Sequence, residues 1–460
     1  MYLNALLMNH ISAIIDFFAN KNILILGFGR EGQSTYKFLR KYLPYQHLTI
    51  ADKKDVNFLE TNVTLITGED YLDSINDFDI VIKTPGISLN KIKTTFDIDK
   101  ISSQTEIFLK HFKYQTIGIT GTKGKSTTSS LIYHILKNNR PNVLLGGNIG
   151  IPLFDLIENI DNETIVVTEL SAHQLEYVHH APHISILLNL FQEHLDHFNN
   201  FENYVNAKWK IHTLQNKKDI FIYNEDDYLI SQSPSLHSIT THNFPFSRVD
   251  AIENGAFVEG DFIMSKKNGN LSSVYSISSF QNIPGKHNFY NIMASILACE
   301  ALNVDPNEIT KHISTFQGLE HRIEYVGHYH DIFFYNDSIS TIPEATISAL
   351  EALYNVDTLI LGGFDRGIEY RSLYQYLNHH SVSHIIFTGP AGKRMFQEWS
   401  EMTPIKQNTY ITENFDQVIA LCIEKTPQGG KCLLSPAAAS YNEFKNFEER
   451  GNYFKNKIKE

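Results

Sequence analysis

The sequence predicts an α/β protein with three domains, and three observations support this fold class. The chain has 460 residues, which corresponds to about three domains of roughly 150 residues each. Short apolar runs alternate with helix-like segments, the pattern of parallel strands joined by crossover helices. Two glycine-rich segments, residues 27–32 and 118–127, directly follow such runs and precede helices. Hydrophobic residues make up 42% and charged residues 20%, as in ordinary globular proteins.

The first domain, residues 1–112, is expected to alternate strands with helices after an N-terminal helix over residues 1–18. Continuous short apolar runs are typical of buried strands. They predict strands at residues 22–26, 47–50 and 79–83. The alternation indicates a parallel sheet with helices on its faces. The N-terminal helix lacks the basic start of a signal peptide.

A glycine-rich turn, Gly27-Phe28-Gly29-Arg30-Glu31-Gly32, follows the first strand and leads into a helix through Leu39. Asp52 lies 20 residues beyond Gly32. This is the dinucleotide fingerprint, in which a pyrophosphate sits at a helix N-terminus and an acid contacts the ribose. It fits NAD, but the same geometry serves any diphosphate-linked nucleotide, and a UDP-linked substrate is the favoured interpretation. A purely structural turn is the third.

The second domain, residues 113–317, is also expected to be α/β. Its predicted strands are residues 142–145, 164–168, 184–190 and 219–223. Residues 238–281 alternate polar with apolar side chains between Gly and Asn turns, which predicts a small antiparallel patch. A helix is expected over residues 288–302.

The most informative motif opens this domain: Gly118-Ile119-Thr120-Gly121-Thr122-Lys123-Gly124-Lys125-Ser126-Thr127, followed by a helix through Lys137. Small residues allow backbone N–H groups to converge on phosphates, Lys125 can reach the terminal phosphates, and Ser126 can hold Mg²⁺. Five residues separate Gly118 from Gly124, one more than in the common phosphate-loop pattern. An ATP site is therefore expected at Gly121, Thr122, Lys123, Gly124, Lys125, Ser126 and Thr127.

Two further residues follow strands of this domain. Glu169 comes directly after the strand 164–168, where a carboxylate beside a phosphate loop can bind Mg²⁺, although it also fits a solvated strand end. His194 follows the strand 184–190 and could bind a second metal ion or contact the substrate. Lys208 lies in a helix-like stretch, and composition alone predicts a solvated charge without a role.

The third domain, residues 318–460, has predicted strands at residues 331–335, 358–361, 384–388 and 431–434. Beside the first of them, Arg322 could reach a phosphate and Asp337 could accept ribose hydroxyls. Asn288, at the start of a helix in the second domain, could contact a nucleobase. Each of these residues also fits a capped helix or a turn.

Composition bounds the partners. Acids outnumber bases, 51 to 39, for a net charge of −12, which argues against a nucleic-acid surface. Three scattered cysteines fit neither a disulfide framework nor a zinc site, so a reducing cytoplasm is expected. No apolar run is long enough to span a membrane. We expect a cytoplasmic monomer that acts on small molecules.

Taken in this order, the motifs resemble those of the Mur ligases, in particular the glutamate-adding branch. The resemblance covers nearly the whole chain and rests on the phosphate loop, Asn148-Ile149-Gly150, Glu169-Leu170-Ser171, the His194 loop, Ala207-Lys208, Gly285-Lys286-His287-Asn288, His321-Arg322 and Asn336-Asp337-Ser338. The most specific part is the C-terminal run Leu434-Ser435-Pro436-Ala437-Ala438-Ala439-Ser440, continued by Phe444-Lys445-Asn446-Phe447-Glu448-Glu449-Arg450-Gly451.

The resemblance implies a fold and an activity. The fold would have an N-terminal Rossmann-like UDP-binding domain, a central P-loop ATPase-like domain and a C-terminal Rossmann-like domain. The activity would be an ATP-dependent and Mg²⁺-dependent ligation of glutamate to UDP-N-acetylmuramoyl-L-alanine in peptidoglycan precursor synthesis. ATP would phosphorylate the alanine carboxylate, and the glutamate amine would then displace phosphate from the acyl phosphate.

The resemblance also implies residue roles. The catalytic residues would be Lys125, Glu169, His194 and Lys208. Magnesium would be held by Ser126, Glu169, His194 and Lys208, the last as a carbamate. ATP would also contact Asn288, Arg322 and Asp337. The UDP substrate is expected at Gly29, Arg30, Glu31, Asp52, Thr84, Pro85, Gly86 and Asn148. Glutamate is expected at Thr341, Arg366, Ser435 and Phe444.

Three positions depart from typical D-glutamate ligases of this branch. Lys123 stands in place of Asn, Ile339 in place of Lys, and Phe364-Asp365-Arg366-Gly367 in place of Asp-Gly-Lys. Those lysines help to hold the incoming glutamate or to order its pocket, although Arg366 can still bind a carboxylate. D-glutamate is the family default, and the same reaction with L-glutamate is the alternative.

Two other classes stay open as distant alternatives. An NAD-dependent oxidoreductase would use the turn at residues 27–32 but would leave the phosphate loop and Glu169 unexplained. A nucleotide-gated binding protein with a vestigial site would not need Lys125, Glu169, His194 and Lys208 together.

Overall fold

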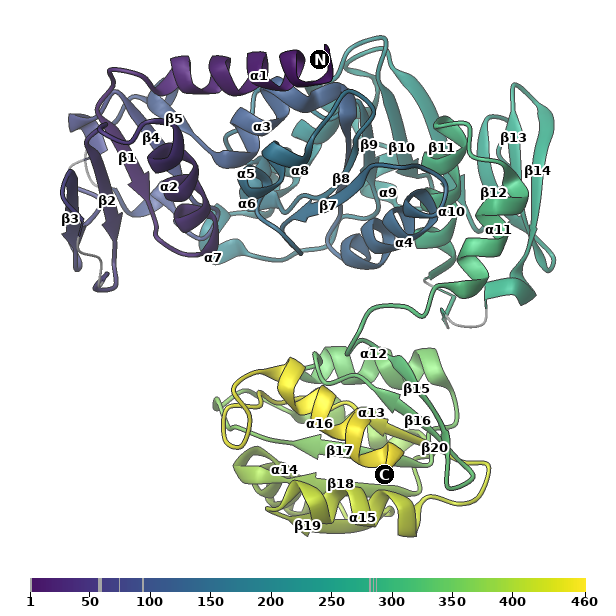
Figure 1. The fold of residues 1–460 in the computed structure, drawn as a ribbon. Helices are drawn as coiled ribbons and strands as arrows, with labels where there is room; N and C mark the ends of the chain where they lie inside the picture. The colour runs from purple at the N-terminus through teal and green to yellow at the C-terminus, as the bar shows by residue number, and fades with distance from the viewer. Residues whose placement is uncertain are drawn as a thin grey trace. The chain divides into compact units, whose positions relative to one another are not determined.

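The computed structural model describes residues 2–56, 60–73, 75–92, 95–280, 283, 285–286 and 288–460. His287, next to Asn288, lies outside the described residues. The described residues form three β-sheets with helices packed against them (Figure 1), so the predicted α/β class is confirmed. The chain divides into two compact units. Residues 1–279 and 289–313 form the first, which holds two sheets, and residues 280–288 and 314–460 form the second.

The N-terminal sheet is parallel, with strand order β3-β2-β1-β4-β5. Its strands are β1 (Ile23–Leu26), β2 (Leu48–Asp52), β3 (Val63–Thr67), β4 (Ile80–Lys83) and β5 (Ile101–Ser102). The accompanying helices are α1 (Tyr2–Phe18), α2 (Arg30–Tyr42) and α3 (Gln104–Phe112). The N-terminal helix α1 packs on α3, where the rings of His10 and Phe112 lie 5.0 Å apart (Figure 1). The three predicted strands correspond to β1, β2 and β4, which are buried along nearly their whole length, whereas β3 and the two-residue strand β5 were not predicted.

The central sheet has the order β14-β13-β12-β11-β10-β9-β6-β8-β7. Its strands are β6 (Thr116–Thr120), β7 (Val143–Gly147), β8 (Ile165–Glu169), β9 (Ile184–Leu187), β10 (Ile220–Asn224), β11 (His242–Ser247), β12 (Gly255–Glu259), β13 (Phe262–Lys267) and β14 (Asn270–Ser276). Its helices are α4 (Lys125–Lys137), α5 (Leu153–Leu156), α6 (Ala172–Leu175), α7 (Leu195–Phe198), α8 (Phe201–Thr213), α9 (Tyr228–Ser231), α10 (Asn288–Ala301) and α11 (Pro306–Thr315).

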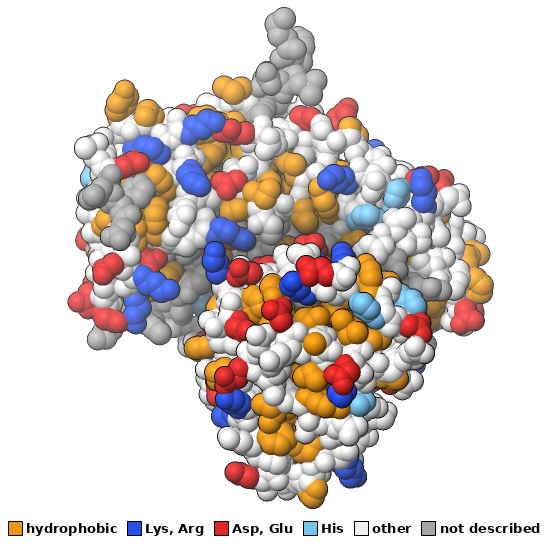
Figure 2. Space-filling model, turned by 60° about the horizontal axis from the view of Figure 1, so that its bottom comes forward, with side chains coloured by type: hydrophobic (Ala, Val, Ile, Leu, Met, Phe, Trp, Pro, Cys, Tyr) orange, Lys and Arg blue, Asp and Glu red, His pale blue; other side chains and the backbone are white. Residues whose placement is uncertain are grey.

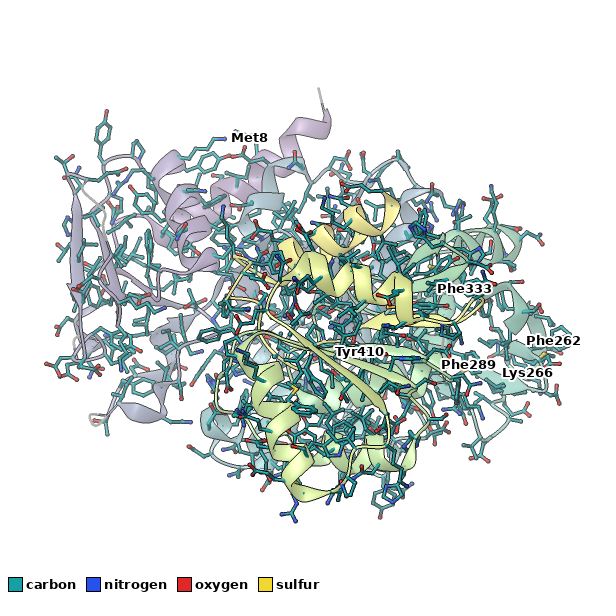
Figure 3. All side chains as sticks on the ribbon, turned by 90° about the horizontal axis from the view of Figure 1, so that it is seen from below. Met8, Phe262, Lys266, Phe289, Phe333 and Tyr410 are labelled. Atoms are coloured by element: carbon teal, nitrogen blue, oxygen red, sulfur yellow. The ribbon has the colours of Figure 1, made fainter. Side chains whose placement is uncertain are left out.

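The antiparallel patch expected at residues 238–281 is wrong in its first part. Strand β11 pairs in parallel with both β10 and β12, and only β12, β13 and β14 pair antiparallel. The reason is the connection from β10 to β11, which passes through α9 and a short 3-10 helix, because such a crossover returns the chain in the same direction. Phe262 and Lys266 of β13 lie at the far end of this sheet, among the antiparallel strands (Figure 3).

The third sheet has the order β15-β16-β20-β17-β18-β19 and is parallel except for the pair β15–β16. Its strands are β15 (Glu324–Tyr329), β16 (Ile332–Asn336), β17 (Thr358–Gly362), β18 (His384–Thr388), β19 (Asn408–Thr412) and β20 (Lys431–Leu434). Its helices are α12 (Pro343–Leu353), α13 (Arg371–His379), α14 (Gly389–Met402), α15 (Phe415–Lys425) and α16 (Phe447–Lys459). Two buried hydrophobic clusters pack this unit, one with α12, α13 and α14 and the other with α15 and α16.

Short 3-10 helices complete the fold at Ile75–Asp77, Leu89–Lys91, Ile98–Lys100, Lys113–Gln115, Ile157–Asn159, Pro234–His237 and Ile277–Phe280. On the face drawn in Figure 2, acidic and basic side chains are interspersed among apolar ones. Among the described residues, no helix is long and apolar enough to cross a membrane.

Candidate active site

The phosphate loop connects β6 to α4 and depends on two glycines with positive φ. Gly121 has φ +155° and Gly124 has φ +85°, and Gly124 is the N-cap of α4. A Cβ on Gly124 would come within 2.3 Å of Asn291 Oδ1. The positive φ of Gly124 and this close contact both exclude a side chain at the position. The loop therefore presents the N-terminus of a 13-residue helix, the geometry that binds phosphate.

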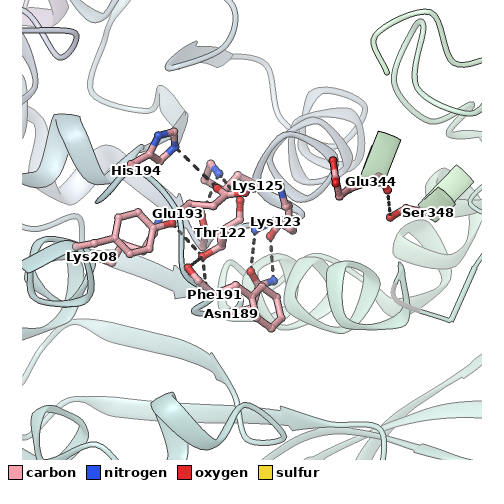
Figure 4. Close-up of polar contacts among 12 residues, drawn as sticks. Thr122, Lys123, Lys125, Asn189, Phe191, Glu193, His194, Lys208, Glu344 and Ser348 are labelled. Carbon is pink, nitrogen blue, oxygen red and sulfur yellow. Dashed lines mark hydrogen bonds and ion pairs between the residues drawn. The ribbon is translucent and has the colours of Figure 1, made fainter. Parts of the chain in front are cut away.

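The loop is fixed by the segment that follows β9 (Figure 4). Thr122 N–H donates to Asn189 O (2.9 Å), and Lys123 N–H donates to Asn189 Oδ1 (2.7 Å). Asn189 Nδ2 donates back to Lys123 O (3.0 Å), and Phe191 N–H donates to Thr122 Oγ1 (2.9 Å). Asn189 was assigned no role from the sequence, because the predicted strand 184–190 includes it, whereas β9 ends at Leu187 and leaves Asn189 in the loop that follows.

Glu169 is the last residue of β8, beside β6, and its side chain is buried. One carboxylate oxygen, Oε1, accepts a hydrogen bond from Asn148 Nδ2 (2.6 Å). The other, Oε2, is buried and has no hydrogen-bond partner. An unpaired buried carboxylate oxygen is costly unless a cation compensates it, so Glu169 fits the magnesium site expected here.

Lys208, on α8, is only 1% exposed, so the solvated charge predicted from composition is wrong. Its Nζ donates to Gly121 O (2.8 Å) and lies 4.9 Å from the centre of the Tyr204 ring. Lys125 Nζ donates to the same carbonyl (2.9 Å), so two ammonium groups share one acceptor. Burial, and after it the charge of Lys125, lowers the pKa of Lys208 well below its ordinary value. The two ammonium groups beside the carbonyl of Gly121 would therefore stabilise a negatively charged group that binds there.

His194 is the N-cap of α7 and has φ +57°, an uncommon conformation for a residue other than glycine. Its ring centre lies 4.8 Å from that of His173, and Glu193 Oε2 lies 3.8 Å from its Nε2. Burial lowers the pKa of His194, against the opposite effect of the Glu193 charge, and the charge of Lys208 also lowers it. A neutral imidazole of this kind can act as a metal ligand.

No group of three or more His, Cys, Asp or Glu side chains that could hold a metal ion occurs in the described part of the chain. Glu169 and His194 would be the two ordinary side-chain donors. A magnesium ion here would therefore need Ser126, a carbamylated Lys208 or phosphate oxygens of the nucleotide as further ligands.

The predicted UDP site lies at the carboxyl ends of β1, β2 and β4. Gly27 has φ +92°, and a Cβ on Gly32 would come within 2.1 Å of Gly27 O. Asp52 Oδ2 accepts a hydrogen bond from Phe28 N–H (2.7 Å), so this carboxylate already holds the glycine turn. Thr84 Oγ1 donates to Leu26 O (3.0 Å), which places the predicted contacts Thr84, Pro85 and Gly86 beside the turn.

Direct contacts join this turn to the central sheet within the first unit. Arg30 Nη2 donates to Asn148 O (3.2 Å), and the Asn148 side chain in turn donates to Glu169. Gln174 Nε2 donates to Glu31 Oε1 (2.7 Å). The predicted substrate residue Asn148 therefore links Arg30 to the predicted metal ligand Glu169, and Glu31 is held by Gln174 of the central domain.

In the second unit, Asp337 and Ser435 are in contact, because Ser435 Oγ donates to Asp337 Oδ2 (2.6 Å). Thr341 and Arg366 also meet, because Arg366 Nη2 donates to Thr341 O (2.9 Å). Arg322 is exposed. The Phe444 ring packs 5.2 Å from the Phe415 ring and 5.6 Å from the Tyr453 ring, in a cluster with α15 and α16. Asn288 is the buried first residue of α10.

A phosphate loop ahead of a buried carboxylate, on a parallel sheet, defines an α/β protein of the nucleotide-binding class. Comparison with known proteins gives the family. The Mur ligase middle domain matches residues 119–299. UDP-N-acetylmuramoylalanine–D-glutamate ligase of Clostridium tetani is 32% identical over 96% of this chain and 97% of its own. The enzyme of that name from Desulfitobacterium hafniense is 33% identical over 95% and 97%. The chain belongs to the Mur ligase family.

Solved structures agree on the fold. MurC, UDP-N-acetylmuramate–alanine ligase of Thermotoga maritima, matches with a TM-score of 0.58 and 18% identity over 96% of this chain and 99% of its own. MurF ligase of Thermotoga maritima, solved in complex with ADP, matches with a TM-score of 0.57 and 17% identity over 95% of both chains. At this identity the likeness concerns the fold alone.

Proposed function

We propose that this protein is an ATP-dependent ligase that joins D-glutamate to UDP-N-acetylmuramoyl-L-alanine through an acyl phosphate, in peptidoglycan precursor synthesis. The relatives named for this reaction align over nearly the whole chain. The observation that carries the proposal is a pair of charged sites at the ends of two neighbouring strands. Just after β6, Lys125 and Lys208 both donate to Gly121 O. At the end of the adjacent strand β8, Glu169 has a buried carboxylate oxygen without a hydrogen-bond partner.

The chemistry follows from the charges at this site. A carboxylate is a poor electrophile, and its phosphorylation supplies a leaving group for attack by an amine. Lys125 and the N-terminus of α4 would bind the triphosphate and offset the charge that gathers on the transferred group. Magnesium, when bound, would neutralise phosphate oxygens, and Ser126, Glu169, His194 and a carbamylated Lys208 would hold it. The lowered pKa of Lys208 supports this modification, because only the neutral amine reacts with carbon dioxide.

The remaining roles divide by domain. Residues 1–112 would bind the UDP part at Gly29, Arg30, Glu31, Asp52, Thr84, Pro85 and Gly86, with Asn148 of the central domain at the muramoyl part. Residues 113–317 would bind ATP together with Arg322 and Asp337. Residues 318–460 would bind glutamate at Thr341, Arg366, Ser435 and Phe444. The protein would act as a cytoplasmic monomer.

Two kinds of observation bear on the isomer of glutamate: the names of the relatives and the cations of the second unit. The two relatives described above are named as D-glutamate ligases, which supports D-glutamate. Ile339 and Arg366 stand where lysines are typical, and Arg366 donates to Thr341 O. A guanidinium can bind a carboxylate through two parallel hydrogen bonds, so it can replace an ammonium but at a different distance from the backbone. L-glutamate is the alternative outcome of the experiment below.

The test is phosphate release from ATP with UDP-N-acetylmuramoyl-L-alanine and either D-glutamate or L-glutamate. We expect release with D-glutamate, and loss of at least a hundredfold in Lys125→Ala because the terminal phosphates lose their cation. Glu158→Gln, which removes a surface pair with Lys41, is the matched control and should leave the rate unchanged. Release with L-glutamate alone would correct the isomer. No release with either, with NADH binding in calorimetry, would favour an oxidoreductase instead.

A further inference from the structure

Two loops of the phosphate site are bridged by an ion pair that the proposed mechanism does not use. Lys123 Nζ, on the phosphate loop, lies 2.5 Å from Glu193 Oε1, on the loop between β9 and α7 (Figure 4). Glu193 stands next to His194, and its charge acts on the pKa of Lys208 and of His194. The pair therefore lies at the edge of the catalytic cluster.

The backbone of Lys123 is fixed, whereas its side chain lies in solvent. The N–H and the carbonyl of Lys123 are both bonded to the Asn189 side chain, at 2.7 Å and 3.0 Å. Its own side chain is 66% exposed, and that of Glu193 is 31% exposed. Only side-chain rotation is needed to move this ammonium from one partner to another.

We propose that Lys123 is a second cation for the triphosphate and that Glu193 holds it in reserve until ATP binds. This inference rests on the proposed function, because it assigns a further role at the same nucleotide site. Lys123 would exchange the Glu193 carboxylate for phosphate oxygens of ATP, and Glu193 would set the strength of ATP binding by competing for the same ammonium. Glu193 is thus a positioning residue that acts through Lys123.

The relative strengths of the two partners favour this exchange. An exposed Lys–Glu pair gains little, because water screens both charges. A phosphate group at the N-terminus of α4 would carry more negative charge than one carboxylate and would lie among backbone N–H groups. Lys125, in contrast, is bonded to the carbonyls of Gly121 and Thr122 within its own loop. The exposed ammonium of Lys123 has the longer reach into solvent.

The proposal predicts opposite effects for the two halves of the pair. Lys123→Gln should weaken ATP binding about tenfold, because one charge-assisted contact to phosphate is lost. Glu193→Gln should tighten it about two- to fivefold, because it removes a weak competitor. The double variant should bind ATP like Lys123→Gln, since Glu193 acts only through Lys123. Lys123→Arg keeps the cation and should stay within about threefold of the wild type.

The measurement is calorimetric titration of the full chain with ATP, with and without Mg²⁺, before any ligase assay. Thermal unfolding should be the same for all variants, since the pair is exposed. Glu158→Gln, which breaks the exposed pair of Glu158 with Lys41, should leave ATP binding unchanged. In turnover, Glu193→Gln should lower the KM for ATP and leave kcat within about twofold.

The outcomes separate this inference from the proposed function. If the wild type binds ATP and Glu193→Gln weakens that binding, or Lys123→Gln leaves it unchanged, the inference is wrong and the ligase assignment stands. If weakening by Glu193→Gln occurs only with Mg²⁺ present, Glu193 holds the metal rather than Lys123. If the wild type does not bind ATP at all, the proposed function fails together with it.

Discussion

Asp337 shows how a single residue of this protein combines burial with a candidate role in ATP binding. Its carboxylate is buried and accepts hydrogen bonds from Ser435 Oγ and from Ile323 N–H. Burial raises the pKa of Asp337 from 3.8 to about 6, against the opposite effect of these hydrogen bonds. Desolvation therefore outweighs hydrogen bonding at this site, and the charged carboxylate destabilises the folded unit at neutral pH.

The sign of this effect can be tested. A raised folded-state pKa means that the proton contributes stability below pH 4 and that this contribution is lost as the pH rises through about 6. Asp337→Asn mimics the protonated form, so it should gain about 2–3 kcal/mol of stability relative to the wild type between pH 4 and pH 7.5. Urea unfolding at both pH values measures this difference.

Asp365 supplies a control of opposite sign. Its carboxylate is bonded by Arg394 Nε (2.7 Å) and Nη2 (2.8 Å), and the side-chain hydrogen bonds from Arg394 lower the pKa of Asp365 below 3.8. The charged Asp365 carboxylate therefore stabilises the folded unit at neutral pH, and this stabilisation is lost as the pH falls and the group is protonated. Asp365→Asn should accordingly be less stable than the wild type at pH 7.5. If Asp337→Asn and Asp365→Asn both gain or both lose stability at pH 7.5, burial does not determine the pKa of Asp337.

Among the elements, the turn between β1 and α2 restricts its residue types most tightly, because glycine is required at Gly32. A Cβ on Gly32 would meet Gly27 O at 2.1 Å, whereas a Cβ on Gly29 would meet nothing within 4 Å. Gly32→Ala should therefore cost about 1–3 kcal/mol by overpacking and displace the helix start. We expect it to weaken binding of the UDP substrate at least tenfold in calorimetry while ATP binding is retained.

Gly29→Ala is the matched change. It adds the same methyl group three residues before Gly32, at φ −71°, where an alanine is unstrained. Its unfolding midpoint should equal that of the wild type. If Gly32→Ala were as stable as Gly29→Ala, the close approach of α2 to Gly27 would not be required for the fold.

The elements that the sequence did not predict have a common place in the sheets. The missed strands β3, β5, β15 and β19 are edge strands; β3, β15 and β19 are only partly buried along their length, and β5 is buried but has only two residues. An edge strand has a neighbouring strand on one side only and meets solvent on the other. It therefore lacks the continuous apolar run by which β1, β8 and β17 were predicted. In the first and third sheets, local sequence therefore identifies the central strands better than the edge strands, whereas β7, an edge strand of the central sheet, was predicted.

The same distinction applies to the site. The phosphate loop is a local motif, so its glycines and Lys125 could be placed from sequence. Lys208 looks like a surface residue because its helix is polar, and only the packing of α8 against the end of β6 brings it to Gly121 O. Glu193 and Asn189 likewise gain their roles from contacts with the phosphate loop about 70 residues away in the chain.

At the scale of the whole molecule, the chain is built from two compact units that carry different parts of the proposed reaction. The first holds the phosphate loop, Glu169, His194 and Lys208, together with the turn at Gly27. The second has its own sheet with a hydrophobic cluster on each face. A unit with a complete sheet and its own core can fold alone.

We therefore expect residues 318–460, expressed alone, to unfold cooperatively in urea and to show an α/β circular-dichroism spectrum. Residues 1–317 should bind ATP about 10- to 100-fold more weakly than the full chain if Arg322 and Asp337 are ATP contacts as proposed, since the fragment lacks both. Lys125→Ala in this fragment should abolish that binding, and the fragment should release no phosphate with glutamate. A split at Gly260, in the turn between β12 and β13, cuts one sheet and should give fragments that do not fold.

If residues 318–460 fail to fold while the Gly260 fragments fold, the boundary of the units lies elsewhere. If residues 1–317 bind ATP as tightly as the full chain, Arg322 and Asp337 do not contact the nucleotide.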